Sequence, residues 1–174
     1  ESNRANPWIR IDYFEEQTQF VKNLNELARK NLKIRLYQHD YEWEQISRWN
    51  NNFSDLKIDY GLNQMRNIIS KIAIFISTYN ATTFLESIYL NIPTIIFWNP
   101  NHWELNEISN EMFNKLKHIK VFHESPVSAA SHLNNIVKEP LEWWNKTEVK
   151  LVINEFKNKY CRKTNINQIL KEIK

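Results

Sequence analysis

Residues 72–86 read Ile72-Ala73-Ile74-Phe75-Ile76-Ser77-Thr78-Tyr79-Asn80-Ala81-Thr82-Thr83-Phe84-Leu85-Glu86. The first six residues form an apolar run that ends in a serine, which is typical of a strand buried on both faces of a parallel sheet. Hydroxyl and amide side chains follow directly, and apolar residues then recur with helical spacing. This stretch therefore predicts a strand, a polar turn and a helix, which is the repeating unit of an α/β domain.

Short apolar runs alternate with segments of helical period on both sides of this unit. Further strands are predicted at residues 33–37, 56–59, 94–98 and 119–122. Helices are predicted at residues 13–30, 42–50, 62–70, 83–90, 107–116, 125–137, 141–145, 148–160 and 165–173. We therefore expect a single three-layer α/β domain over residues 1–174, with a Rossmann-like sheet of about five parallel strands and a helical C-terminal tail.

Composition and charge narrow the class of function. Hydrophobic residues make up 42% of the 174 residues and aromatic residues 13%, which is enough to fill a core. The formal net charge is only +3, and lysines and arginines are scattered among acidic residues, so no nucleic-acid partner is expected. The chain contains neither G-x-G-x-x-G nor a Walker A motif, which disfavours dinucleotide and P-loop chemistry.

The sequence favours a cytoplasmic protein. Cys161 is the only cysteine, so no disulfide can form within the chain. Residues 1–10 are polar and carry no apolar segment of a signal peptide. The longest apolar stretch, residues 92–98, contains a proline and is too short to span a bilayer. Peripheral membrane association of the full-length protein remains open.

The polar segment after residues 72–77 is the strongest candidate site, because ligands of open parallel sheets bind beyond the carboxyl ends of the strands. Phosphate can bind where a helix begins, and the hydroxyl and amide groups that could add donors there are those of Thr78, Asn80, Thr82 and Thr83. Glu86 could accept hydrogen bonds from a ribose diol. Alternatively, Thr83 and Glu86 form only a capping box.

The other candidates come from isolated residues. His39, His102 and His123 each follow or end a predicted strand, but a lone histidine such as His39 is explained equally well by a surface loop. Arg35 lies within a predicted strand and could simply pair with a neighbouring carboxylate. The histidines lack the spacing of metal ligands and there is no cysteine cluster, so no metal and no cofactor are expected. No catalytic residue is assigned.

The chain resembles the C-terminal domain of GT-B glycosyltransferases in the runs Ile76-Ser77-Thr78-Tyr79-Asn80-Ala81-Thr82-Thr83-Phe84-Leu85-Glu86 and Asn91-Ile92-Pro93-Thr94-Ile95-Ile96-Phe97-Trp98-Asn99-Pro100. A third run, Arg35-Leu36-Tyr37-Gln38-His39-Asp40, matches the Arg-Leu-Tyr-x-His-Asp element of the same family. The likeness is strongest to transferases of bacterial O-antigen and related surface-polysaccharide gene clusters, and it covers about residues 13–160.

The resemblance implies a role in binding the nucleotide-sugar donor. His39, in the same element as Arg35, would face the donor diphosphate, and Glu86 would hold the ribose hydroxyls. The phosphate oxygens would be held by Thr78, Asn80, Thr82 and Thr83. The resemblance also implies a longer two-domain enzyme of lipopolysaccharide biosynthesis. Its N-terminal acceptor domain lies outside this chain, so we expect the chain alone to be inactive.

Two other functions remain open. The first is a GT-B-fold sugar epimerase or a polyol-phosphate transferase, because the glycerophosphate and capsule polymer transferases share the arginine-to-histidine element. The second is a noncatalytic module that binds a nucleotide or a partner.

Overall fold

The computed structural model describes residues 7–40 and 43–161. The helices in these residues are α1 (Pro7–Lys22), α2 (Glu26–Asn31), α3 (Gln45–Asn52), α4 (Thr83–Tyr89), α5 (Glu107–His118), α6 (Pro126–Ile136), α7 (Pro140–Trp144) and α8 (Thr147–Tyr160). The strands are β1 (Lys33–Arg35), β2 (Lys57–Asp59), β3 (Phe75–Ser77), β4 (Thr94–Phe97) and β5 (Phe122–His123). Two 3-10 segments, η1 (Met65–Asn67) and η2 (Ile69–Lys71), lie between β2 and β3.

The strands of the described part form two sheets rather than the single Rossmann-like sheet expected from the sequence. β1 pairs with β2, and a separate sheet has the order β3-β4-β5. Every pairing is parallel, as expected for an α/β chain in which helices connect the strands. The α/β class and the parallel strands are thus confirmed, and the single five-stranded layout is not.

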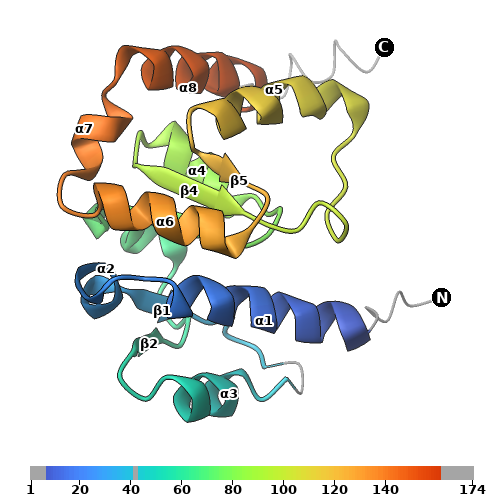
Figure 1. Cartoon of the computed structure of the whole chain (residues 1–174), viewed down its shortest axis with the longest axis vertical. Coiled ribbons are helices and arrows are strands. Elements are labelled where there is room, and N and C mark those ends of the chain that lie inside the picture. Colours follow the sequence, from blue (N-terminus) through green and yellow to red (C-terminus); the bar gives the residue numbers. More distant parts are fainter. Residues whose placement is uncertain (1–6, 41–42, 162–174) are drawn as a thin grey trace.

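Helices cover the larger sheet on both sides (Figure 1). α5 and α8 lie on one side of β4 and β5, and α6 packs against these strands from the other side. α1 in turn packs against α6. Trp98, Ile95 and Ile96 are completely buried between these layers, which explains why residues 94–98 are almost entirely apolar.

α1 connects the two sheets. The ring of Phe20 stacks on Phe97 of β4 at a centroid distance of 5.0 Å. On the other side of the helix, the ring of Phe14 meets the edge of Trp49 of α3 at 5.3 Å. Both sheets therefore contribute to one hydrophobic cluster, with Ile34 of β1 and Ile58 of β2 partly buried against it.

The prediction of one continuous helix over residues 13–30 is wrong, because residues 23–25 interrupt it between α1 and α2. Asn25 caps α2, with its Oδ1 accepting a hydrogen bond from the amide of Ala28 at 2.8 Å. Asn134 of α6 stabilises this interruption, because its Oδ1 accepts a hydrogen bond from the Asn25 amide and its Nδ2 donates one to the Asn23 carbonyl. Asparagine favours such caps over helix interiors, and its position here ends the helical stripe.

Two further predictions fail for local reasons. Residues 62–70 contain η1 and the start of η2 rather than an α-helix, and the carbonyls of Gly61 and Asn63 accept hydrogen bonds from Arg35. The strand predicted at residues 119–122 starts later, because Lys120 has a φ of 63° and ends α5 in the left-handed region.

Several local predictions are confirmed. The start of α6 has Ser125 as N-cap, with its Oγ accepting from the amide of Ser128, and Pro126 in the first turn. α4, β4, α5 and α8 also lie within a few residues of the predicted ranges. The helix predicted at residues 165–173 lies outside the described residues.

Candidate functional site

The segment after β3 is held by α1. The hydroxyl of Tyr13 lies 2.7 Å from Thr78 Oγ1, and Gln17 Nε2 donates a hydrogen bond to the same oxygen at 3.0 Å. Tyr13 and Gln17 are four residues apart, so they occupy one face of α1. The first predicted phosphate ligand, Thr78, is therefore part of a helix–loop contact.

The loop after β4 meets the same face of α1. His102 Nε2 lies 3.5 Å from Asp12 Oδ2. Burial raises the pKa of Glu16 above its ordinary value, while a hydrogen bond with the Asn99 side chain and the charge of His102 act in the opposite direction. α1 thus brings the carboxylates of Asp12 and Glu16 to the loop after β4, beside the imidazole of His102.

Aromatic rings link the three segments at this edge. The rings of Tyr13 and Tyr79 meet edge to face at 6.1 Å, and Tyr79 lies 6.1 Å from Trp103 in the loop after β4. Such contacts stabilise an arrangement beyond the area that they bury. The loops after β3 and β4 are therefore fixed to each other and to α1.

The start of α4 is polar but is not a capping box. Thr82 is the N-cap residue, has helical φ and ψ, and makes no side-chain cap hydrogen bond. Thr83 is the first helical residue, so Glu86 lies one position beyond the place that a capping box requires. Within the described residues, the side chains of Asn80, Thr82, Thr83 and Glu86 take part in no hydrogen bond or ion pair. Glu86, Asn80 and Thr82 are exposed to solvent.

Arg35 has partners within the fold. Its Nη1 lies 2.7 Å from Asp59 Oδ2, and its Nη2 donates to the carbonyls of Gly61 and Asn63. This geometry agrees with the interpretation of Arg35 as the partner of a neighbouring carboxylate. His39 is exposed after β1, and its ring lies 6.2 Å from that of Tyr37.

The residues predicted at strand ends, His39, Thr78 and His123, do not belong to one sheet. Thr78 and His123 end or follow strands of the same sheet, whereas His39 follows a strand of the other sheet. His123 is 3% exposed, with Nδ1 2.8 Å from Ser128 Oγ and Nε2 3.0 Å from the Lys120 carbonyl. Burial lowers the pKa of His123 to about 4, so this histidine is a neutral core residue at pH 7.

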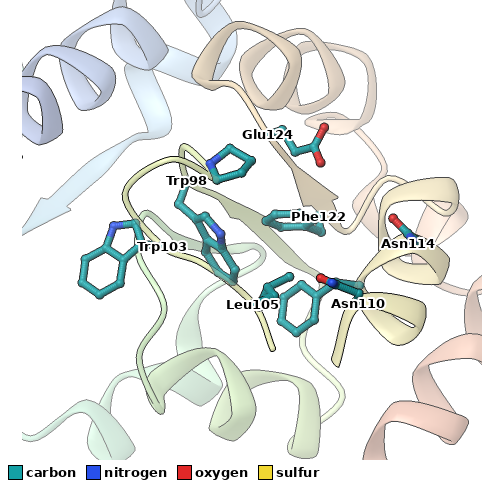
Figure 2. A pocket seen from close by; sticks show the side chains of 9 residues that line it. Trp98, Trp103, Leu105, Asn110, Asn114, Phe122 and Glu124 are labelled. Atoms are coloured by element: carbon teal, nitrogen blue, oxygen red, sulfur yellow. The ribbon is translucent and has the colours of Figure 1, made fainter. Parts of the chain in front are cut away.

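A small pocket lies beside the ends of β4 and β5 (Figure 2). Its volume is about 90 Å³, well below the ~300–1,000 Å³ of clefts that enclose drug-sized ligands. Rings of Trp98, Phe113 and Phe122 form its apolar wall, and Glu124 lies at its polar side together with Asn110 and Asn114 of α5. None of the predicted site residues lines this pocket.

Among residues 7–40 and 43–161, no group of three His, Cys, Asp or Glu side chains is arranged to hold a metal ion. In the same part of the chain, no helix has both the length and the apolar character needed to cross a membrane.

Sequence reasoning did not identify the α1 residues at this edge. These residues, Asp12, Tyr13, Glu16 and Gln17, precede the first predicted strand, and the predicted apolar stripe of the helix does not include them. The available signal was the spacing of these polar residues, which places all four on one helical face.

Comparison with known proteins gives one match. A family model described as LIC12162 family transferase matches residues 1–173. Searches of curated proteins and of solved structures found no match. The chain therefore belongs to the LIC12162 family of transferases.

Proposed function

We propose that this chain binds the nucleotide-sugar donor of a glycosyltransferase that builds bacterial surface polysaccharide. Membership of a transferase family supports the reaction class. The observation that carries the donor assignment is a group of polar side chains where α4 begins, at the carboxyl end of β3, that have no partner among the described residues. Ligands of parallel α/β sheets bind at this edge.

The residues at the start of α4 bind different parts of the nucleotide-sugar donor. Asn80, Thr82 and Thr83 donate hydrogen bonds to phosphate oxygens, and Thr78 adds its hydroxyl from the preceding turn. The exposed carboxylate of Glu86 accepts hydrogen bonds from the ribose diol. α4 has only seven residues, so these side chains contribute more than the helix dipole does.

The chemical contribution of the site is electrostatic. Transfer from a UDP-, GDP- or dTDP-sugar releases a nucleoside diphosphate, and transfer from a CMP-sugar releases CMP. Hydrogen-bond donors that are already oriented stabilise the charge that develops on this leaving group. In the proposed enzyme, which has the two-domain GT-B layout, a second domain binds the acceptor. His39 approaches the diphosphate from the end of β1.

A binding screen tests the proposal. The purified protein is titrated calorimetrically with UDP-, GDP-, CMP- and dTDP-linked sugars, with free glucose and inorganic phosphate as controls. We expect one nucleotide class to bind with a Kd of about 1 mM or tighter, the usual range of enzyme–substrate affinity, and the controls not to bind. Absence of binding to all four classes would contradict the proposal.

A further inference from the structure

Thr78 has an unusual set of hydrogen-bond partners. A threonine hydroxyl carries one hydrogen to donate and two lone pairs that accept. Thr78 Oγ1 has two close neighbours on α1, the Tyr13 hydroxyl at 2.7 Å and Gln17 Nε2 at 3.0 Å. The direction of these two bonds decides what the Thr78 hydroxyl can still do.

The bond from Gln17 has only one direction. An amide nitrogen donates and does not accept, so Gln17 Nε2 fills one lone pair of Thr78 Oγ1. The neighbouring residues on the same face are Asp12, Tyr13 and Glu16, which lie against the loops after β3 and β4.

The Tyr13 bond has a preferred direction. Burial raises the pKa of the Tyr13 phenol above its ordinary value, so the phenol keeps its proton. Thr78 Oγ1 is the one hydrogen-bond partner of this hydroxyl within the described residues. A buried hydroxyl proton without an acceptor costs free energy, and a phenol is a stronger donor than an alcohol, so Tyr13 donates to Thr78.

Both lone pairs of Thr78 Oγ1 are then occupied, and its own hydrogen remains. Among the residues that the structure describes, no acceptor for this hydrogen occurs apart from the two groups that already donate to the oxygen. The hydroxyl can therefore only donate, and no described residue accepts its hydrogen.

We propose that Tyr13 and Gln17 are positioning residues that orient the Thr78 hydroxyl as a donor to a phosphate oxygen of a bound nucleoside diphosphate. This inference rests on the proposed function and adds α1 to the donor site. A phosphate oxygen accepts hydrogen bonds and never donates them, so it matches a hydroxyl whose lone pairs are filled.

A double-mutant cycle separates positioning from packing. UDP, GDP, CDP and dTDP are titrated against the wild-type protein, and the one that binds is titrated against Thr78→Val, Tyr13→Phe and Gln17→Met. Tyr13→Phe keeps the ring contact with Tyr79, and Gln17→Met keeps the side-chain length. The matched controls are Tyr89→Phe and Gln19→Met. Both residues are exposed and, like Tyr13 and Gln17, lie in helices, Tyr89 in α4 and Gln19 in α1.

We expect Tyr13→Phe and Gln17→Met each to weaken diphosphate affinity about threefold to tenfold, the effect of one hydrogen bond. In the Thr78→Val background neither substitution should weaken binding further, because their target is gone. Affinity for the corresponding nucleoside, which lacks phosphate, should not change. The two control variants should bind like the wild-type protein.

The outcomes that overturn the inference are distinct from those that overturn the proposed function. If the wild-type protein binds a diphosphate but Gln17→Met and Tyr13→Phe bind it equally well, the positioning role is wrong and the donor site stands. If Tyr13→Phe and Gln17→Met weaken diphosphate binding as much in the Thr78→Val background as in the wild-type protein, positioning is also contradicted, because their effect would not depend on Thr78. If the wild-type protein binds none of the four diphosphates, the inference fails, and the proposed function fails with it when no nucleotide sugar binds either.

Discussion

Arg35 and Asp59 lie opposite each other in the register of β1 and β2, and their side chains form an ion pair of 2.7 Å. The second guanidinium nitrogen of Arg35 donates to the carbonyls of Gly61 and Asn63. Asp59 in turn accepts a hydrogen bond from the amide of Gly61 at 3.0 Å. The pair therefore joins two strand ends and fixes the turn that follows β2.

Replacement of Arg35 by lysine tests this structural role. Lysine keeps the charge but cannot bond the carboxylate and two carbonyls at once, so we expect Arg35→Lys to lower the free energy of unfolding by about 1–2 kcal/mol. Urea denaturation measures the change. The control is Arg29→Lys, since Arg29 pairs with Asp55 at the surface and its loss should cost less than about 1 kcal/mol. Equal losses in the two variants would contradict the special role of Arg35.

Gly61 is required by the backbone of the same turn. Its φ is +74°, and a Cβ at this position would lie 2.6 Å from the Leu36 carbonyl oxygen. We expect Gly61→Ala to destabilise the fold by about 1–3 kcal/mol, measured by urea denaturation. Lys120→Gly is the converse change, because Lys120 already has a φ of 63°, and it should leave stability within about 1 kcal/mol of wild type. A Gly61→Ala variant as stable as the wild-type protein would refute this account of the turn.

Buried His123 and half-buried His132 of α6, whose rings lie 5.5 Å apart, predict sensitivity to acid. Burial is the main cause that lowers the pKa of each of these histidines from 6.5 to about 4, and the charges of His123, Lys120 and Lys146 contribute to the lowered pKa of His132. Between pH 6.5 and about pH 4, the unfolded chain binds more protons than the folded one. Stability is therefore complete above about pH 6.5 and falls towards pH 4, by up to about 1.4 kcal/mol per pH unit for each histidine.

The measurement compares urea denaturation at pH 7.0 and pH 4.5 for the wild-type protein and His132→Leu. Carboxylates titrate in both proteins, so the difference between them isolates the histidine. We expect His132→Leu to lose less stability on acidification, and the exposed control His118→Leu to lose as much as the wild-type protein. Parallel pH dependence in all three proteins would show that His132 is not the titrating group.

The sequence predicts the parts of the fold in which local signals and tertiary packing agree. Ser125 and Pro126 mark the start of α6 because capping depends on neighbouring residues alone. β4 is recognisable because a strand covered on both faces has few polar residues. The predicted polar segment after β3 also lies where it was expected, at the carboxyl end of a parallel strand.

The remaining features depend on partners that are distant in sequence. Asn134, more than one hundred residues away, holds the break between α1 and α2, so no local pattern reveals it. The contact of Tyr13 and Gln17 with Thr78 has the same origin. The division into two sheets is likewise decided by which strands pair, and apolar periodicity does not encode the pairing partner.

The donor-binding claim is tested most directly by calorimetric titration of Glu86→Gln with the preferred nucleotide sugar. The side chain of Glu86 is exposed and makes no hydrogen bond within the described residues, so its substitution should leave the melting temperature nearly unchanged. The lost carboxylate would have bonded the ribose diol, and hydrogen bonds to charged groups contribute roughly 1.5–3 kcal/mol each. We therefore predict at least about tenfold weaker binding, with unchanged affinity in the control Glu107→Gln, an exposed glutamate in the first turn of α5. Wild-type affinity in Glu86→Gln would contradict the proposed donor site.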